Sequence, residues 1–323
     1  MNTKTGTNIN EAISLLRSGE IVAIPTETVY GLAGNGTDEK AIQKIFKAKK
    51  RPLSNPLILH FSNLEHLSKY VKNLPKHAKI LAEHFWPGPL TLLLDKSEII
   101  PDMVNAGNRR VAVRIPNHEM TLKLLSKIDF PLAAPSANLY GRISPTKVEH
   151  VLNQLDQIIP YVLNGGECNN GIESTIVGFD ENSPIIYRLG AITVEQIESC
   201  LGQKIKIHNH NIQNSGPDAS GMVKFHYAPR TPMYNIEQIC TKEETSNFGY
   251  IGFDTLNHLI PAENQFLLSE EGDLRIASKN LYHAMHHMDQ KHFKKIFICD
   301  FPNEELGRSM NDRIKKAIAK FNA

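Results

Sequence analysis

Two arginines stand inside apolar stretches of the sequence, where a positive charge needs a reason. Arg114 lies in VAVRI (111–115) and Arg188 in IIYRL (185–189), and both stretches are typical of buried strands. An unpaired guanidinium is costly to bury, so each arginine needs an internal carboxylate or an anionic ligand as its partner. Two such arginines indicate a doubly anionic ligand, for example an amino-acid carboxylate together with a phosphate.

Short polar clusters adjoin other predicted strands, at the strand ends where α/β folds place ligands. PTETVYGL (25–32) follows the first strand, APSAN (134–138) ends another, and ESTIV (173–177) begins a third. Their hydroxyl, amide and carboxylate groups are therefore candidates for ligand contacts. The first two clusters are also compatible with ordinary turns, and for the first of them the residues alone favour the turn.

A basic cluster precedes another predicted strand. Lys49, Lys50 and Arg51 stand beside Pro52, and three cations there could hold phosphates. The same residues at the end of a helix are also ordinary partners of the helix dipole, and the two interpretations are equally supported. His60 ends an apolar run, and a lone histidine in that setting is more often a core residue than a ligand.

Several widespread catalytic motifs are missing. The sequence has no G-x-x-x-x-G-K-[ST] phosphate loop, no G-x-S-x-G nucleophile elbow, no H-E-x-x-H and no paired C-x-x-C. GLAGNG (31–36) is rich in glycine but lacks the dinucleotide-binding spacing, and we expect it to form a loop. His283 and His287 have the i,i+4 spacing that could bind a metal, but a solvated helix face explains them better, so we expect no metal-binding residues.

Composition sets the broad class of the protein. The length of 323 residues predicts two domains, and 41% hydrophobic with 22% charged residues is an ordinary soluble balance. A formal net charge of +2 is too small to indicate nucleic-acid binding. The N-terminus is polar, and no stretch of about 20 apolar residues is present. The four cysteines lack C-x-x-C spacing. These features predict a cytoplasmic protein with reduced thiols and no membrane contact.

The elements that would position these residues alternate between strands and helices. One helix is predicted with Asn10 as its N-cap and Gly19 as its stop, and others begin near Asp38, at Pro145 and at a capping box on Thr193. This alternation predicts an α/β fold with a mixed sheet. The strands predicted before residue 202 are 21–25, 57–61, 91–95, 111–115, 131–135, 161–164, 174–179 and 185–189.

The chain changes character after residue 202. Residues 203–232 are rich in Asn, Gly, Pro and Ser and show little periodicity, which predicts a linker. From residue 233 strands and helices alternate again, so residues 233–323 are expected to form a second, smaller α/β domain. Its strands are predicted at 250–254, 265–268 and 295–301, and its helices at 273–289 and 307–321.

The clusters, taken in their order, resemble a known family. They are PTETVYGLAG (25–34), KKRPLSNPLILH (49–60), WPGPLT (86–91), VAVRIPNH (111–118), APSANLYGRISPT (134–146), GIESTIV (171–177) and YRLGAIT (187–193). Over roughly residues 8–202 they resemble the YrdC-like domain, the catalytic domain of threonylcarbamoyl-AMP synthases. SGMVKFHYAPRTP (220–232) and GRSMNDRIKKA (307–317) resemble the linker and the end of the second domain in the long form of that family.

The resemblance implies a fold, a division of the chain and a reaction. A YrdC-like twisted mixed sheet with flanking helices would occupy residues 1–202, the linker 203–232 would cover the active site, and residues 233–323 would form a small Rossmann-like domain. The reaction would condense L-threonine, bicarbonate and ATP, with Mg²⁺ accompanying ATP, to threonylcarbamoyl-AMP and pyrophosphate. A tRNA threonylcarbamoyl-transferase complex would be the partner that uses the product.

Motif positions carry the implied site residues. Lys49 and Arg51 match the family's K-x-R pair and are the implied catalytic residues, Arg114 would take the threonine carboxylate, and Tyr227 would fold back over the nucleotide. The implied threonine pocket consists of Thr28, His60, Arg114, Ala134 through its backbone, and Ser174. The implied ATP-binding residues are Arg51, Asn55, Arg110, Ser136, Asn138, Ser144, Arg188 and Tyr227.

Two motifs depart from the family pattern, and two other functions stay open. Ala219 and Ser220 stand where the family linker usually has Ser-Pro, and Leu189 replaces the proline that usually follows the arginine. The main alternative is an RNA-binding module without catalysis, although no interleaved aromatic and basic stretch supports it; weak RNA binding beside catalysis is a further expectation. A carbamoyl-transfer partner of hydrogenase maturation would need acylphosphatase-like and zinc modules, which this sequence lacks.

Overall fold

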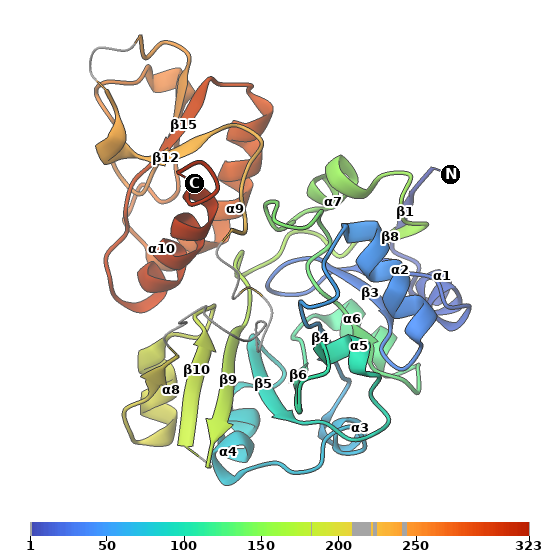
Figure 1. The fold of residues 1–323 in the computed structure, drawn as a ribbon. Helices are drawn as coiled ribbons and strands as arrows, with labels where there is room; N and C mark the ends of the chain where they lie inside the picture. The colour runs from blue at the N-terminus through green and yellow to red at the C-terminus, as the bar shows by residue number, and fades with distance from the viewer. Residues whose placement is uncertain (1, 182, 209–220, 222–224, 241–243, 323) are drawn as a thin grey trace.

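The computed structural model describes residues 2–181, 183–208, 221, 225–240 and 244–322, which form two parts, each built on its own sheet (Figure 1). Within these residues the larger sheet has eleven strands of mixed direction, in the order β1-β8-β2-β3-β7-β4-β6-β5-β9-β10-β11. The smaller sheet has four parallel strands in the order β12-β15-β13-β14. The predicted α/β class with a mixed sheet is confirmed.

Most predicted strands are present, with bounds that differ by a few residues. The large sheet contains β1 (Lys4–Gly6), β2 (Val22–Ile24), β3 (Gly31–Asn35), β4 (Ile58–His60), β5 (Leu90–Asp95), β6 (Arg110–Arg114), β7 (Leu132–Ala133), β8 (Tyr161–Leu163), β9 (Thr175–Asp180), β10 (Ser183–Arg188) and β11 (Lys206–Ile207). The small sheet contains β12 (Met233–Asn235), β13 (Phe248–Gly252), β14 (Gln265–Leu267) and β15 (Lys295–Ile298).

Helices cover both sheets. In the first part they are α1 (Ile9–Arg17), α2 (Glu39–Lys49), α3 (Leu64–Ser68), α4 (Lys76–Phe85), α5 (Asp102–Asn105), α6 (Glu119–Leu125), α7 (Val148–Leu155) and α8 (Val194–Leu201). In the second part they are α9 (Leu274–Gln290) and α10 (Glu305–Ile318), with single 3-10 turns at Ile236–Gln238 and Ala262–Asn264.

Local side-chain chemistry explains where several helices begin and end. The capping box predicted at Thr193 is present on α8, because the Thr193 hydroxyl accepts from the Gln196 amide and the Gln196 side chain accepts from the Thr193 amide. Asn10 is not the cap of α1 as predicted: Asn8 is, and its side chain accepts from the amides of Asn10 and Glu11. The start predicted at Pro145 is also wrong, since α7 begins three residues later, at Val148.

The glycine-rich segment 31–36 is a buried strand for the most part, and the expected loop is wrong. As β3 it pairs antiparallel with β2 and with β7 in the middle of the large sheet. A side chain at Gly31 would bring a Cβ to 3.2 Å from the Cβ of Ala134. Glycine weakens an isolated strand, but here it permits close approach to the neighbouring chain, and that tertiary contact overrides the local preference.

The C-terminal part packs on the first part through an apolar core. Helices α9 and α10 lie on the side of the small sheet that faces the large one (Figure 1). Their buried residues, among them Leu281 and Met310, form one cluster with Val29, Ile143 and Ile172 of the first part. The two parts therefore share a hydrophobic interface.

Only part of the predicted linker can be compared with the structure. Residues 209–220 and 222–224, including Ala219, Ser220 and most of the motif's start, lie outside the described residues. Residues 206–207 extend the large sheet as β11, and His226, Tyr227 and Ala228 are buried. The predicted boundaries at 202 and 232 stay predictions.

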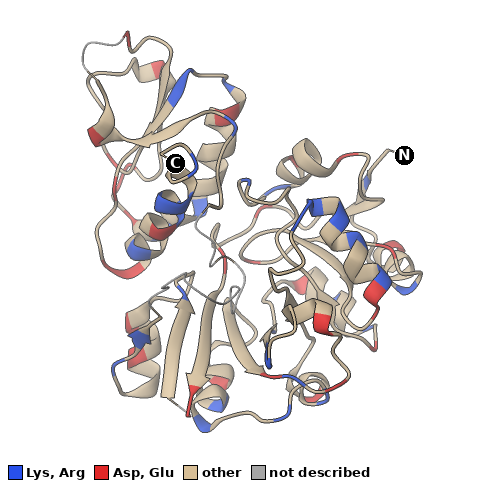
Figure 2. Cartoon of the chain, viewed as in Figure 1, with Lys and Arg blue, Asp and Glu red and all other residues tan. Residues whose placement is uncertain are grey.

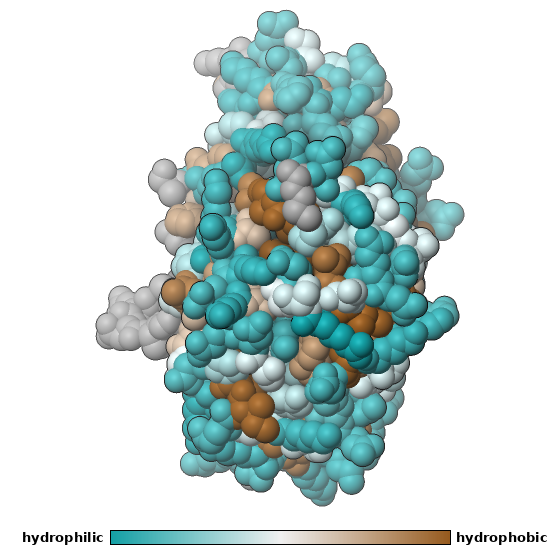
Figure 3. Space-filling view, turned by 90° about the vertical axis from the view of Figure 1, so that its right-hand side faces the viewer, coloured by the Kyte–Doolittle hydropathy of each residue, from teal (hydrophilic) through white to brown (hydrophobic). Residues whose placement is uncertain are grey.

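Charged residues are distributed over the helices and loops of the described chain. In Figure 2 lysines, arginines, aspartates and glutamates lie mainly on helices and loops, with both signs interspersed, while the strands of the large sheet are almost free of them. The face seen in Figure 3 is mostly hydrophilic with scattered hydrophobic residues. No helix in the described part of the chain is long and apolar enough to span a bilayer.

Candidate active site

A small hollow gathers residues that are far apart in the sequence. All five residues of the implied threonine pocket line it, and so do three of the implied ATP-binding residues. The lining consists of Thr26, Thr28, Val29, Gly31, Ile58, His60, Arg114, Ala134, Pro135, Ser136, Glu173, Ser174, Arg188, His226 and Tyr227. Strands β4 and β6 run in parallel beneath it, so that His60 stands opposite Arg114 at the ends of the two strands.

Arg114 is held from three sides at the end of β6. Its Nε donates to the Gly88 carbonyl at 3.2 Å, and its Nη1 donates to the Thr28 hydroxyl at 3.0 Å. Its Nη2 lies 2.7 Å from Oε1 of Glu27, a close ion pair in which neither atom makes an aligned hydrogen bond within the described residues. A guanidinium is a planar fork with five N–H groups. The three contacts fix its orientation and leave N–H groups for the carboxylate of a ligand.

His60 lines the hollow as an uncharged imidazole. It is 3% exposed, and burial together with the Arg114 cation lowers the pKa of its imidazole to about 3. Its Nδ1 has no hydrogen-bond partner among the described residues. A buried polar atom without a partner is uncommon, so this nitrogen is available to a polar group of a ligand.

Ser174 and Arg188 are joined on the other side of the hollow. Arg188 donates from Nε and Nη2 to the Ser174 carbonyl, at 3.1 and 2.9 Å, and from Nη2 to the Ser174 hydroxyl at 2.9 Å. The same hydroxyl lies 2.7 Å from that of Thr91. The arginine predicted for ATP and the serine predicted for threonine therefore share one hydrogen-bonded unit.

Tyr227 and His226 close the hollow from the linker side. Tyr227 is 1% exposed and has a φ of +65°, an uncommon backbone conformation for a residue with a side chain. With both residues in place the hollow measures about 40 Å³. Pockets for drug-sized ligands measure about 300–1,000 Å³, so a nucleotide would fit only after this segment moves.

The two implied catalytic residues do not line the hollow. The Lys49 ammonium is buried, and it donates to the carbonyl of Asn138 at 2.6 Å and to that of Ser136. Burial and the neighbouring Arg51 cation hold the pKa of Lys49 well below its ordinary value. In this conformation Lys49 shapes the loop that carries the S-x-N pair.

Arg51, Asn55 and Asn138 lie beside that loop. Arg51 donates from Nη2 to the side-chain oxygen of Asn55 at 2.9 Å and from Nε to its carbonyl at 3.1 Å. Asn55 in turn donates to the Tyr140 hydroxyl at 3.2 Å. The side-chain oxygen of Asn138 is buried and has no hydrogen-bond partner among the described residues.

Two implied ATP-binding residues point elsewhere. Arg110 begins β6, roughly 13 Å along the strand from Arg114 at the usual rise per residue, and donates to the Tyr187 hydroxyl at 3.0 Å. The structure does not bring it to the hollow. Ser144 is fully buried, and its hydroxyl donates to Glu173 at 2.6 Å.

Sequence reasoning missed two buried carboxylates. Glu27 pairs with Arg114, and Glu173 stands between Arg188 and Arg313. The sequence does indicate them, because a buried arginine requires an anionic partner. Both glutamates also lie in the clusters PTET and ESTIV, next to the predicted site residues Thr28 and Ser174. Which carboxylate would meet which arginine depends on strand order, which the sequence does not give.

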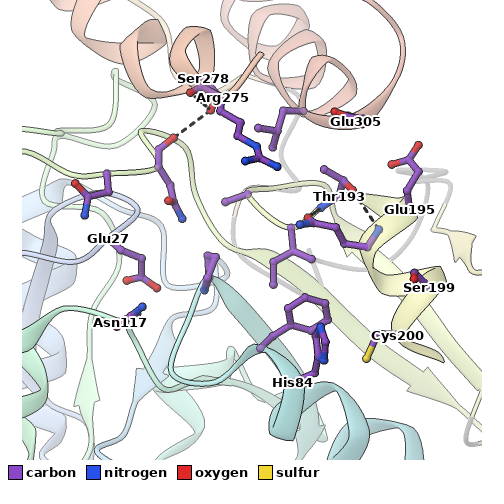
Figure 4. Close-up of a pocket in the computed structure, with 18 residues that line it drawn as sticks. Glu27, His84, Asn117, Thr193, Glu195, Ser199, Cys200, Arg275, Ser278 and Glu305 are labelled. Carbon is purple, nitrogen blue, oxygen red and sulfur yellow. Dashed lines mark hydrogen bonds between the residues drawn. The ribbon is translucent and has the colours of Figure 1, made fainter. Parts of the chain in front are cut away.

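A much larger cavity of about 870 Å³ lies between the two parts (Figure 4). Figure 4 shows Glu27 and Asn117 on one side, Arg275 reaching in from the C-terminal part, and Glu195 on a further side. A dashed contact joins the Ser278 hydroxyl to a carbonyl of the first part, Asn170 O, at 3.3 Å. None of the site residues predicted from the sequence lines this cavity.

The solvated helix face predicted for His283 and His287 is not observed, because both side chains are half-buried. No group of three or more His, Cys, Asp or Glu side chains in the described ranges is arranged to hold a metal ion. His283 packs at 5.7 Å from the ring of His150 and at 5.9 Å from Phe266 instead.

Known proteins match this chain over most of its length. A family model described as "Telomere recombination" (Sua5_yciO_yrdC) matches residues 14–190, and one described as "Threonylcarbamoyl-AMP synthase, C-terminal domain" matches residues 192–319. The threonylcarbamoyl-AMP synthase of Pyrococcus abyssi is 38% identical, covering 96% of this chain and 93% of that protein. The one from Bacillus subtilis is 36% identical, covering 96% and 92%. The crystal structure of P. abyssi Sua5 complexed with L-threonine has a TM-score of 0.87 at 37% identity and covers 96% of this chain and 94% of that one.

Proposed function

This chain belongs to the threonylcarbamoyl-AMP synthase family, and from that premise we propose how its hollow serves the reaction. The chain is an enzyme that forms threonylcarbamoyl-AMP. We propose that its substrates are L-threonine, bicarbonate and ATP, and that pyrophosphate is the leaving group. The observation that supports it best is that all five implied threonine residues line one hollow together with Arg188 and Ser136.

In the proposal Arg114 binds the threonine carboxylate. Its guanidinium is oriented by Glu27, Thr28 and Gly88, so the donors that face the hollow are fixed before the ligand arrives. An oriented arginine recognises a carboxylate through two parallel hydrogen bonds. The neutral His60 imidazole and the Ser174 hydroxyl remain for the amine and hydroxyl of threonine.

The adenylation step needs charge stabilisation more than a nucleophilic side chain. The amine of threonine and bicarbonate first form a carbamate with loss of water. A carbamate oxygen then attacks the α-phosphorus of ATP, and the bond from that phosphorus to the pyrophosphate oxygen breaks. Negative charge develops on the leaving pyrophosphate. Arg188 and Arg51 are the cations placed to stabilise it, while Lys49 holds the loop of Ser136 and Asn138 on which ATP would lie.

Tyr227 would cover the bound substrates. Because the hollow is too small for a nucleotide as it stands, His226 and Tyr227 have to move out before ATP enters and return over it. Closure of this kind excludes water from a labile carbamate and a reactive mixed anhydride. The left-handed conformation of Tyr227 allows the chain to turn sharply into the site.

Mg²⁺ would enter with ATP rather than on a protein cage. Mg²⁺ is usually held by substrate phosphates with one or two carboxylates. Within the described residues the carboxylate that lines the hollow is Glu173, and it already accepts from Ser144, Tyr282 and Arg313. These residues do not form a resident metal site, and no step of the proposed mechanism is assigned to the ion.

The product would pass to a tRNA threonylcarbamoyl-transferase complex, and we propose the cytoplasm as the place of the reaction. RNA binding without catalysis is not favoured, because the relatives that match along the whole chain carry the name of the synthase. A weak contact with RNA beside catalysis stays a prediction.

Pyrophosphate release tests the proposal directly. The full chain is incubated with ATP, Mg²⁺ and bicarbonate, with and without L-threonine, and pyrophosphate is measured by a coupled assay. We expect release that depends on threonine. L-Serine, which lacks one methyl group, is the matched control and should be about 10–200-fold poorer in kcat/KM. Absence of release from folded protein would overturn the proposal.

A further inference from the structure

A buried carboxylate connects the two parts of the chain directly behind the hollow. Glu173 is 7% exposed and precedes Ser174 in the loop before β9. Its Oε1 accepts from the Ser144 hydroxyl at 2.6 Å, and its Oε2 accepts from the Tyr282 hydroxyl at 2.9 Å and from Nε of Arg313 at 2.9 Å. Tyr282 and Arg313 belong to α9 and α10 of the C-terminal part.

Arg313 reaches further into the first part than this one contact. Its side chain is 0% exposed, and its Nη2 donates to the Leu189 carbonyl at 2.6 Å. One turn earlier on α10, the Ser309 hydroxyl donates to the Gly190 carbonyl at 2.9 Å. Helix α10 therefore holds the end of β10, immediately after Arg188.

The two segments that α10 holds are pressed against each other. The Ala191 amide donates to the Glu173 carbonyl at 3.0 Å. A Cβ built on Gly190 would lie only 2.4 Å from the carbonyl carbon of Ser174, so no side chain fits there. A shift of Glu173 or of Leu189 would consequently displace Ser174 and Arg188, which are hydrogen-bonded to one another across the hollow.

The charges around Glu173 make this arrangement sensitive to the loss of any one member. Burial alone would raise the pKa of Glu173, but the Arg313 and Arg188 cations and the Ser144 hydroxyl outweigh it and lower that pKa to about 2. Arg313 also donates from Nη1 to Asp312 at 2.6 Å, so Glu173 and Asp312 together face the Arg313 cation. Removing one partner from a buried ion pair leaves an uncompensated charge, which is strongly unfavourable.

The same C-terminal side chains also contact the linker residue that closes the hollow. The Arg313 guanidinium lies 5.2 Å from the centre of the Tyr227 ring, within the range of a cation–π contact. The Tyr282 ring stacks at 5.7 Å from that of Tyr227. Arg313 thus meets three segments of the site: Glu173 with Ser174, Leu189 after Arg188, and Tyr227.

We propose that Arg313 is a positioning residue for the active site, acting through Glu173 and Leu189 to fix Ser174 and Arg188. The C-terminal part thereby contributes to the geometry of the substrate pocket, while His226 and Tyr227 of the linker cover it. The proposal rests on the proposed function in one respect only, namely that Ser174 and Arg188 serve threonine and ATP.

The test compares two arginines of α10 in the full chain. Arg313→Met removes the contacts with Glu173 and Leu189, together with those to Asp312 and Tyr227. Arg308→Met is the matched control, because Arg308 also crosses between the two parts, to Glu195 on α8, but reaches no residue of the hollow. For Arg313→Met we expect the KM for both L-threonine and ATP to rise by roughly tenfold or more. For Arg308→Met we expect both KM values to stay within about twofold of those of the wild type, as for an ion pair at the surface.

Two further variants keep the test informative if Arg313→Met folds poorly. Tyr282→Phe removes one of the two hydroxyl groups that donate to Glu173, and should raise both KM values by about threefold. Arg313→Lys retains the cation and should recover part of the loss seen with Arg313→Met. Normal KM values in Arg313→Met and in Tyr282→Phe would overturn the proposal, including when the melting temperature falls.

A readout without substrates separates this proposal from the proposed function. Amide hydrogen exchange is followed by mass spectrometry in a peptide spanning residues 171–178. Exchange of this peptide should be about tenfold faster in Arg313→Met than in the wild type and unchanged in Arg308→Met. If the wild type releases no pyrophosphate, the proposed function fails, and exchange still decides whether Arg313 orders Ser174. Equal exchange in both variants would overturn the inference.

Discussion

Each arginine at the hollow is fixed by acceptors before any ligand binds. Arg114 has the Glu27 carboxylate, the Thr28 hydroxyl and the Gly88 carbonyl, while Arg188 has the carbonyl and hydroxyl of Ser174. Acceptors on one side of a guanidinium hold the donors of the other side toward the hollow. At the scale of single residues, the site is therefore a set of oriented donors rather than a reactive nucleophile, as expected for adenylation.

Arg114→Lys tests this orientation. Lysine keeps a cation beside Glu27, so the buried carboxylate is not left unpaired, but it lacks the planar fork that matches a carboxylate. We expect the KM for L-threonine to rise by roughly 10–100-fold, with a much smaller change in the KM for ATP. Steady-state pyrophosphate release at varied threonine measures it.

The control for this variant lies on the same stretch of chain. Arg109→Lys changes an arginine whose side chain is 80% exposed and whose partner is Asp95, away from the hollow. It should leave both KM values within about twofold of the wild type, because exposed ion pairs contribute little. An unchanged threonine KM in Arg114→Lys would show that the carboxylate is bound elsewhere.

Single residues could be chosen from the sequence where their type contradicted their surroundings. Arg114 and Arg188 stood out as cations in apolar strands, and both line the hollow. Glu173 and Arg313 could not be paired in this way, since 140 residues separate them and their contact depends on how α10 packs against the first part. Arg110 shows the converse situation: its motif position was carried over from the family, and the strand places that residue four positions from Arg114, at its other end.

Histidines at the contact between α7 and α9 make the interface sensitive to pH. His150 of α7 stacks on His286 of α9 with ring centres 3.9 Å apart. Burial lowers the pKa of His286 to about 4 despite the Ser144 carbonyl that it contacts. Burial and the neighbouring His286 and His283 lower that of His150 to about 2. Both rings are neutral in the folded protein at neutral pH.

The free energy of unfolding should therefore fall as the pH is lowered from 6.5 toward 4. In that range the unfolded chain, with an ordinary histidine pKa of about 6.5, binds protons that the folded chain does not. For His286 alone the loss at pH 5 relative to neutral pH is about 2 kcal/mol. Melting temperatures at pH 7 and pH 5 measure it.

His286→Gln supplies the matching variant, because its side-chain amide can still donate to the Ser144 carbonyl without gaining a charge. It should show a smaller drop in melting temperature between pH 7 and pH 5 than the wild type. His258→Gln alters an exposed histidine of the same part and should keep the full drop. An identical pH dependence in all three proteins would contradict the assignment to this stack.

Elements were predictable where local chemistry decides them. The capping box on α8 and the start of α2 near Asp38 follow from side chains within one turn, and both are observed. The loop predicted for segment 31–36 was wrong, because the glycines of β3 allow close packing against Ala134, which lies about a hundred residues away in the chain. Asn8 rather than Asn10 caps α1 for a related reason, since the Asn8 amide is held by the Tyr161 hydroxyl of β8.

The whole molecule is held together by a core that both parts share. Val29 follows the polar cluster at residues 25–28, and Ile172 directly precedes Glu173. Both are buried against residues of the C-terminal part such as Met285 and Met310. The apolar contact thus lies within one residue of side chains that line the hollow, so separation of the two parts would disturb substrate residues and not only a distant surface.

A fragment that ends at residue 202 tests this coupling. Without the C-terminal part, Val29, Ile143 and Ile172 become exposed, and Glu173 keeps the Ser144 hydroxyl but loses Tyr282 and Arg313. We expect the large sheet to persist by circular dichroism, with a lower melting temperature and pyrophosphate release reduced by roughly tenfold or more. Because the fragment also lacks Tyr227, full-length Tyr227→Ala is measured beside it. If the fragment loses more activity than Tyr227→Ala, the C-terminal part contributes more than the cover that Tyr227 provides. If the two losses are equal, the loss of Tyr227 alone explains the effect of the truncation.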